Sequence, residues 1–132
     1  MLQFQGGNIM SILFFVATGM LTVWGISHLV VTKSVVKGFG DLSLDNKRII
    51  TMEWIIEGVT LVFLGVIIGL VTIIDRNSHV SLGVYWLSVI MLNVLSVISL
   101  FTGFKIKFLP FKLCPIIFTG SSILIILGLS GL

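Results

Sequence analysis

Four apolar runs divide this 132-residue chain, and each is long enough to cross a lipid bilayer. They cover residues 9–31, 49–74, 82–104 and 115–132, and a spanning helix needs about 20 mostly apolar residues. The runs are apolar at nearly every position, whereas a strand of a membrane barrel alternates in polarity over about ten residues. A helix satisfies its own backbone hydrogen bonds in lipid. The sequence therefore predicts an all-α membrane protein, with four transmembrane helices in a single domain.

Several classes of chemistry are excluded or disfavoured by what the chain lacks. Cys114 is the only cysteine, which excludes an internal disulfide, a C-x-x-C redox centre and a multi-cysteine metal site. The sequence contains no phosphate loop, nucleophile elbow or H-E-x-x-H motif. We therefore predict no cofactor, and the sequence by itself assigns no reaction.

Basic residues gather in two of the three connections between the runs. Arg76 is the only basic residue of the middle connection, whereas the first and third connections hold Lys33, Lys37, Lys47, Arg48, Lys105, Lys107 and Lys112. By the positive-inside rule, residues 32–48 and 105–112 are expected to be cytoplasmic and both termini outside, in a plasma membrane of bacterial type. The net charge of +3 then reflects orientation and contact with anionic headgroups, and we expect no nucleic-acid partner.

The connections differ in length. Residues 32–48 are too many for a tight hairpin and are expected to lie at the headgroup boundary, with Gly38 and Gly40 interrupting any helix and Ser43 offering an N-cap. The other two connections are short, which favours antiparallel neighbours and an up-down-up-down bundle. Pro110 and Pro115 are expected to end the third helix and to start the fourth.

Aromatic residues and the N-terminal segment suggest where the interfaces lie. Tyr85 and Trp86 are expected at the outer interface and Trp54 at the inner one, because these rings anchor at headgroup level. Residues 1–8 are polar and are expected to be a tail or the remnant of a tag without a functional role.

Two glutamates lie one helical turn apart inside the second run. A charge at the centre of a membrane helix costs about 3 kcal/mol or more, so Glu53 and Glu57 require a partner, a proton or a function. From the rise of a helix, they lie about 7 and 13 Å beyond Arg48. His28 precedes Lys33 by five residues on the first helix, at a matching depth. If the first two helices pack side by side, the imidazole approaches both carboxyl groups.

Such a trio suits a proton relay, or the capture of a lipophilic ligand with a cationic or hydroxylated head. The full set of candidate ligand-binding or proton-relay residues is Glu57, Glu53, His28, Trp24, Trp54, Asn93 and Ser96. Each has a simpler alternative. Glu53 could reach the headgroups, Glu57 could be a protonated packing residue, and His28 could bind a backbone carbonyl. The tryptophans could pack in lipid, and the polar residues of the third run could join helices.

A metal site receives less support from the sequence. His28, Glu53 and Glu57 could form a facial metal site with an open position. His79 is expected at the opposite end of the bundle, so one chain cannot supply two axial histidines to a haem. We therefore predict no metal centre.

Two further functions stay open. Gly65 and Gly69 form a G-x-x-x-G motif that permits close helix approach, which favours a homo-oligomeric transporter or channel subunit. Alternatively, the chain is a structural subunit or assembly factor whose glutamates bind a partner's helix.

Three short stretches carry a resemblance to a known kind of protein. Residues 17–29 (ATGMLTVWGISHL), 52–58 (MEWIIEG) and 63–65 (FLG) resemble small four-helix integral membrane proteins of the broad DoxX-like kind. The resemblance covers the four-span layout and the glycine-spaced stretches. It implies a four-helix fold, and no catalytic residue is carried over from it.

Overall fold

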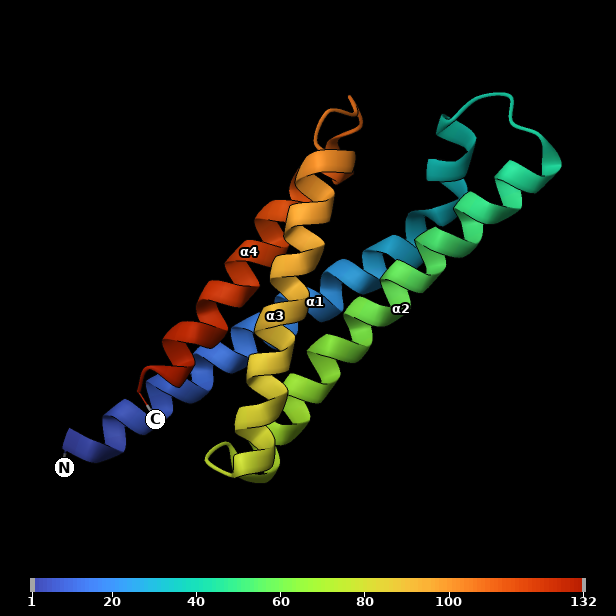
Figure 1. Ribbon diagram of the computed structural model, residues 1–132. Coiled ribbons are helices and arrows are strands. Elements are labelled where there is room, and N and C mark those ends of the chain that lie inside the picture. The colour runs from blue at the N-terminus through green and yellow to red at the C-terminus, as the bar shows by residue number, and fades with distance from the viewer. Residues whose placement is uncertain (1, 132) are drawn as a thin grey trace.

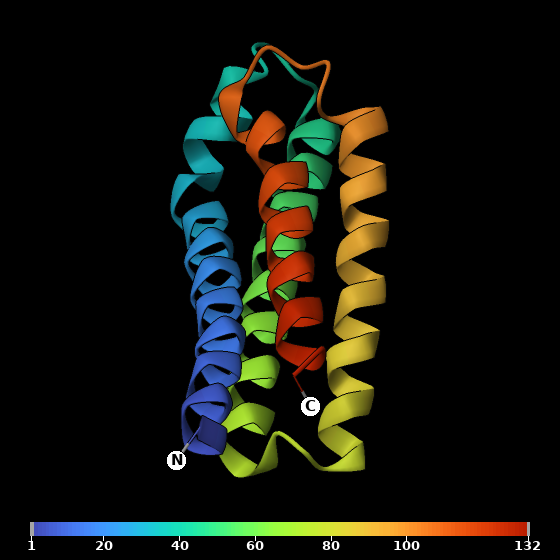
Figure 2. The same cartoon turned by 90° about the vertical axis from the view of Figure 1, so that its left-hand side faces the viewer.

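The computed structural model describes residues 2–131, with side chains from residue 8 onward. This part of the chain folds into four helices, namely α1 (Leu2–Gly38), α2 (Leu44–Asp75), α3 (His79–Thr102) and α4 (Leu109–Leu129). Successive helices run in opposite directions along one bundle (Figures 1 and 2). The predicted fold class, an all-α four-helix antiparallel bundle, is confirmed.

The outer surface of the bundle suits lipid. All four helices are long and apolar enough to cross a membrane. Their outward faces expose large apolar side chains, among them Val30 (75% exposed), Ile73 (72%) and Phe101 (80%). An apolar surface of this extent is unfavourable in water and matches the bilayer interior. The chain is therefore a small integral membrane protein.

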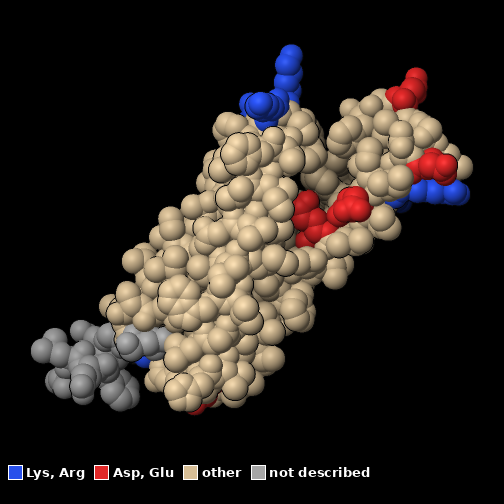
Figure 3. Space-filling view, viewed as in Figure 1, with Lys and Arg blue, Asp and Glu red and all other residues tan. Residues whose placement is uncertain are grey.

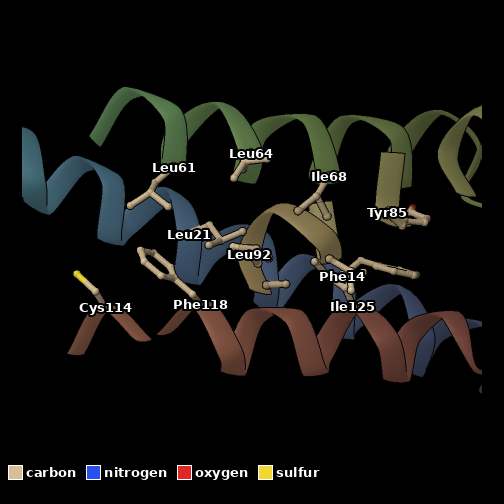
Figure 4. Close-up of a cluster of buried hydrophobic side chains, with 12 residues drawn as sticks. Phe14, Leu21, Leu61, Leu64, Ile68, Tyr85, Leu92, Cys114, Phe118 and Ile125 are labelled. Carbon is tan, nitrogen blue, oxygen red and sulfur yellow. The ribbon is translucent and has the colours of Figure 1, made fainter. Parts of the chain in front are cut away.

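The core lies along the bundle axis and receives side chains from all four helices. Figure 4 shows its residues, including Phe14 and Leu21 from α1, Leu61 from α2 and Phe118 from α4. Close packing of these groups fills the space between the helices, since interiors tolerate few voids.

Tyr85 belongs to this core and not to the lipid-facing surface, while its depth at the outer interface stays a prediction. The side chain is fully buried, and its ring stacks on Phe14 with centroids 4.1 Å apart. Its hydroxyl lies 2.8 Å from that of Thr72. Tyr85 shares an inward helix face with Ser81, Ser88 and other buried residues of α3, at the three- and four-residue spacing that keeps side chains on one side of a helix.

Of the two tryptophans expected at the interfaces, one is buried in the bundle and the other lies on its outside. Trp54 is buried and donates its indole N–H to the carbonyl of His28 at 2.8 Å, so it is a helix-packing residue rather than an interface anchor. Trp86 is half exposed on the outside of α3, and its depth in the membrane stays a prediction.

The first connection is shorter than predicted. Helix α1 continues to Gly38 and buries Val35 and Val36, so these apolar residues belong to the helix and not to a loop at the headgroups. Ser43 is the N-cap of α2 as predicted, because its hydroxyl accepts the Asn46 N–H at 3.2 Å. Gly40 has φ +76°, which glycine adopts without strain and which reverses the chain between the helices.

The two prolines of the third connection are placed differently from one another. Pro110 lies in the first turn of α4, where a missing N–H costs nothing. Pro115 lies inside α4 instead of at its start. Helix α4 therefore begins at Leu109, before the start of the fourth apolar run, and is about one turn longer than that run.

Glycines and threonines bring α1 and α2 into close contact. A Cβ added to Gly65 would collide with Thr22, and one added to Gly69 would lie 3.0 Å from the Thr18 methyl group. Small residues allow helix backbones to approach closely in membranes. The G-x-x-x-G face of α2 is thus occupied by α1 of the same chain, and the predicted use of Gly65 and Gly69 between copies is corrected.

Candidate functional site

A groove runs between α2 and α3 at the end of the bundle that carries seven of the eight basic residues. The two helices are joined by a short turn at the opposite end and diverge toward the groove (Figure 1). Its volume is about 560 Å³, and α4 provides its floor. Acidic side chains lie in this hollow (Figure 3). The lining consists of Glu53, Ile56, Glu57, Thr60, Met91, Leu95, Ile98, Ser99, Thr102, Gly103, Ile106, Phe111 and Cys114.

His28 lies behind the groove, where Gly25 of α1 and Gly58 of α2 bring the two helices into close contact. A Cβ added to Gly58 would lie 2.9 Å from the Gly25 carbonyl and 3.0 Å from the Cβ of His28. The two glycines therefore allow the imidazole to reach α2. His28 is 2% exposed, so the side chain is removed from lipid and water.

One ring nitrogen of His28 is already bound. Nδ1 lies 2.9 Å from the Trp24 carbonyl oxygen, and because a carbonyl only accepts, Nδ1 carries the hydrogen. In the neutral ring, Nε2 then presents a free lone pair. The simpler alternative for His28, a bond to a backbone carbonyl, is thus present, and it leaves the second nitrogen available.

Two side chains from two other helices approach this lone pair. Glu57 Oε1 lies 3.6 Å from His28 Nε2. Cys114 Sγ lies 3.9 Å from the same nitrogen and 4.0 Å from Glu57 Oε1. The glutamate side chain is one-third exposed toward the groove, whereas Cys114 is buried. The predicted approach of His28 and Glu57 is therefore observed, and a thiol joins them.

Sequence reasoning missed Cys114 as a member of the site. It considered the cysteine only as a partner for other cysteines, of which there are none. A signal was present, because Cys114 follows Lys112 by two residues and so lies near the same end of the bundle as His28. Depth alone does not say which way a side chain faces.

Two indoles surround the imidazole. Trp54 stacks on His28 with ring centroids 4.6 Å apart, and Trp24 meets it edge-on at 5.3 Å. The indole N–H of Trp24 lies near the Cys114 thiol, but no described group accepts a hydrogen bond from it. Both tryptophans thus pack around His28, and neither lines the groove.

The remaining candidates lie apart from this cluster. Glu53 is exposed and lines the groove one turn from Glu57. Asn93 donates to the Ser122 hydroxyl at 2.8 Å. Ser96 shares a hydrogen bond with Thr119, also at 2.8 Å. The last two contacts join α3 to α4, as in the simpler alternative for these residues, and neither Asn93 nor Ser96 lines the groove.

No family model, curated protein or solved structure matches the chain. The resemblance to DoxX-like proteins stays a prediction.

Proposed function

We propose that the protein binds an amphiphile in the groove between α2 and α3, with the polar head beside Glu57 and Glu53 and the apolar part against α3. The observation that carries this proposal is a cavity in the membrane domain whose walls are mostly apolar and whose α2 wall holds two carboxyl groups. Its volume of about 560 Å³ lies within the range of small-molecule sites, about 300–1,000 Å³.

The polar groups of the groove favour a head that donates hydrogen bonds. Ser99 donates its own hydroxyl hydrogen to the Leu95 carbonyl at 2.8 Å. Thr102 donates likewise to the Ile98 carbonyl at 2.7 Å. Both hydroxyls therefore offer only lone pairs to a ligand, as ionised glutamates also do. An amine or hydroxyl head satisfies these acceptors, whereas a sulfate or phosphate head does not.

The test compares amphiphiles that share a chain and differ in the head. Purified protein in nanodiscs of zwitterionic lipid is titrated with an alkylamine, the matched alcohol and the matched sulfate, and tryptophan fluorescence is corrected with empty nanodiscs. We expect the amine to bind most tightly. Glu57→Gln should weaken amine binding at least about tenfold, because hydrogen bonds to charged groups contribute about 1.5–3 kcal/mol.

Controls separate the groove from the lipid surface. Trp86→Phe lies outside the groove and should leave amine affinity unchanged, while Glu53→Gln should have a smaller effect than Glu57→Gln because Glu53 is more exposed. Equal binding of amine and sulfate, or unchanged affinity in Glu57→Gln, would contradict the proposal and favour a purely structural role.

A proton relay is the second candidate, favoured by the 3.6 Å separation of His28 Nε2 and Glu57 Oε1. A path across the whole membrane is less favoured, because the core next to the cluster is formed by Leu21, Leu61 and Phe118. Protons would exchange between the groove and His28 only. Proteoliposomes with a trapped pH dye should therefore show no Glu57-dependent proton flux.

We extend the proposal to the orientation of the protein in the membrane and to its relationship with known proteins. With seven basic residues at its end of the bundle, the groove opens toward the cytoplasmic leaflet. We also propose, from residues 17–29, 52–58 and 63–65, that the chain is related to proteins of the DoxX-like kind.

A further inference from the structure

We propose that His28, Glu57 and Cys114 form a binding site for a divalent transition metal ion, with Zn²⁺ as the ion that fits best. The sequence predicted no metal site, since it considered the two glutamates and the histidine without the thiol. This inference goes beyond amphiphile binding and does not depend on it.

The distances suit a single metal ion. The three ligand atoms are separated by 3.6, 3.9 and 4.0 Å, so a point equidistant from them lies about 2.2 Å from each, within the zinc–ligand range of about 2.0–2.3 Å. In a regular tetrahedral zinc site these atoms would be about 3.3–3.6 Å apart. A contraction of a few tenths of an ångström is enough to reach that geometry.

His28 is prepared as a ligand. Metal-binding histidines usually donate their second ring N–H to a carbonyl or carboxylate, which fixes the tautomer and the ring orientation. Here the Trp24 carbonyl accepts the Nδ1 hydrogen at 2.9 Å, and Trp54 stacks on the ring. Trp54 also donates its N–H to the His28 carbonyl. The ring is therefore held with Nε2 facing Glu57 and Cys114.

The charges balance when an ion is present. A thiolate from Cys114 and a carboxylate from Glu57 carry one negative charge each, and a neutral imidazole carries none. A divalent cation makes the cluster neutral, which removes the penalty for two unpaired anions inside a membrane domain. Zinc accepts sulfur, nitrogen and oxygen ligands in the same site, whereas magnesium and calcium prefer oxygen alone.

The fourth coordination position faces the groove. Glu57 and Cys114 both line the groove, while His28 lies behind them. Three protein ligands with one open position are typical of zinc sites that bind water or an exogenous ligand. An oxygen atom of a ligand head in the groove could occupy that position.

The experiment uses Co²⁺ as a spectroscopic probe for Zn²⁺. Metal-stripped protein, reduced and held in nanodiscs, is titrated with Co²⁺. We expect d–d bands of tetrahedral intensity together with a thiolate-to-cobalt charge-transfer band, both of which disappear when Zn²⁺ is added. Cys114→Ser should abolish the charge-transfer band and weaken Zn²⁺ binding at least tenfold. Glu57→Gln and His28→Gln should weaken Zn²⁺ binding by a similar factor.

Matched controls are available in the same chain. Glu53→Gln removes a carboxyl one turn away, and His79→Gln removes an exposed imidazole at the opposite end, so both should keep the parent affinity. If His28→Gln fails to fold, Cys114→Ser still tests the site, because it changes one atom of a small side chain. Absence of a charge-transfer band, or equal Zn²⁺ affinity in Cys114→Ser, would overturn the proposal.

Zinc and amine binding can be separated. Both use Glu57, so Zn²⁺ should lower alkylamine affinity in the parent protein and have no such effect in Cys114→Ser, where the amine still binds. An alkylamine affinity that does not change when Zn²⁺ is added to the parent protein would count against the metal site alone. Loss of amine binding in every variant, with cobalt spectra intact, would count against the amphiphile proposal alone.

Discussion

At the scale of single residues, Tyr85 shows how polar atoms are accommodated inside the bundle. The Thr72 hydroxyl donates to the Ile68 carbonyl at 2.7 Å, so its oxygen accepts the hydrogen of the Tyr85 hydroxyl at 2.8 Å. The phenol is thus satisfied in the core, and the ring stacks on Phe14. The same principle applies at His28, where the Trp24 carbonyl accepts the Nδ1 hydrogen and the Trp54 ring stacks on the imidazole.

The Tyr85–Thr72 bond should contribute measurably to stability. Tyr85→Phe keeps the stacked ring and removes only the hydroxyl, so we expect a loss of about 0.5–1.5 kcal/mol in the free energy of unfolding in detergent. Trp86→Phe, on the lipid-facing side of α3, should change it by less than about 0.5 kcal/mol. If Tyr85→Phe and Trp86→Phe are equally stable, the hydrogen bond makes no net contribution.

At the scale of elements, the contact between α1 and α2 determines where the site forms. Gly25 and Gly58 lie at the crossing beside His28, and farther along the helices Gly65 and Gly69 pack on threonines of α1. Because the backbones are close at this point, a short imidazole reaches Glu57 across the interface. By contrast, α2 and α3 diverge and leave the groove between them (Figure 1).

Adding a methyl group at this crossing should separate the two helices. Gly58→Ala would place its Cβ 2.9 Å from the Gly25 carbonyl oxygen, which is a backbone atom and cannot rotate away. We expect a loss of about 1–3 kcal/mol in unfolding free energy and weaker Co²⁺ binding, because His28 moves away from Glu57. Thermal unfolding and the cobalt titration measure the two effects.

Gly19→Ala provides the matched control on α1. A Cβ at that position meets nothing within 4 Å, so stability should stay equal or rise by up to about 1 kcal/mol from the better helix propensity of alanine. If both alanine variants were equally stable, close approach at Gly58 would not be a constraint.

At the scale of the whole molecule, the charge distribution gives the bundle two different ends. Seven of the eight basic residues lie at one end, in the helix ends and the connection there (Figure 2), and Arg76 lies at the other, 3.3 Å from the Ser11 hydroxyl. This asymmetry predicts one orientation in the membrane. The groove then faces the leaflet that attracts basic residues.

Single-cysteine labelling tests this orientation. In a Cys114→Ser background, Asn77→Cys should react with an impermeant maleimide from outside intact cells. Ser34→Cys should react only after the membrane is opened, because residues 32–48 belong to the basic end. Both native side chains are exposed. Labelling of both positions from the same side would refute the topology, and reversed labelling would refute the orientation.

Much of the architecture was determined by the sequence alone. The length of the apolar runs predicted four helices, and the short connections predicted their antiparallel order. Matching depth, counted from Lys33 and Arg48, predicted that His28 and Glu57 would meet. These inferences succeed because they depend on position along the membrane normal, which helical rise translates directly from residue number.

Only the tertiary structure decided which side of each helix faces inward. It brought Cys114 to His28, 86 positions away, and placed Tyr85 and Trp54 inside the bundle. It also placed Gly65 in contact with α1. The physical reason is that lipid tails are as apolar as a leucine-rich core, so hydropathy does not distinguish a core face from a lipid-facing one. That choice depends on packing and hydrogen bonding between helices, which arise only when all four are assembled.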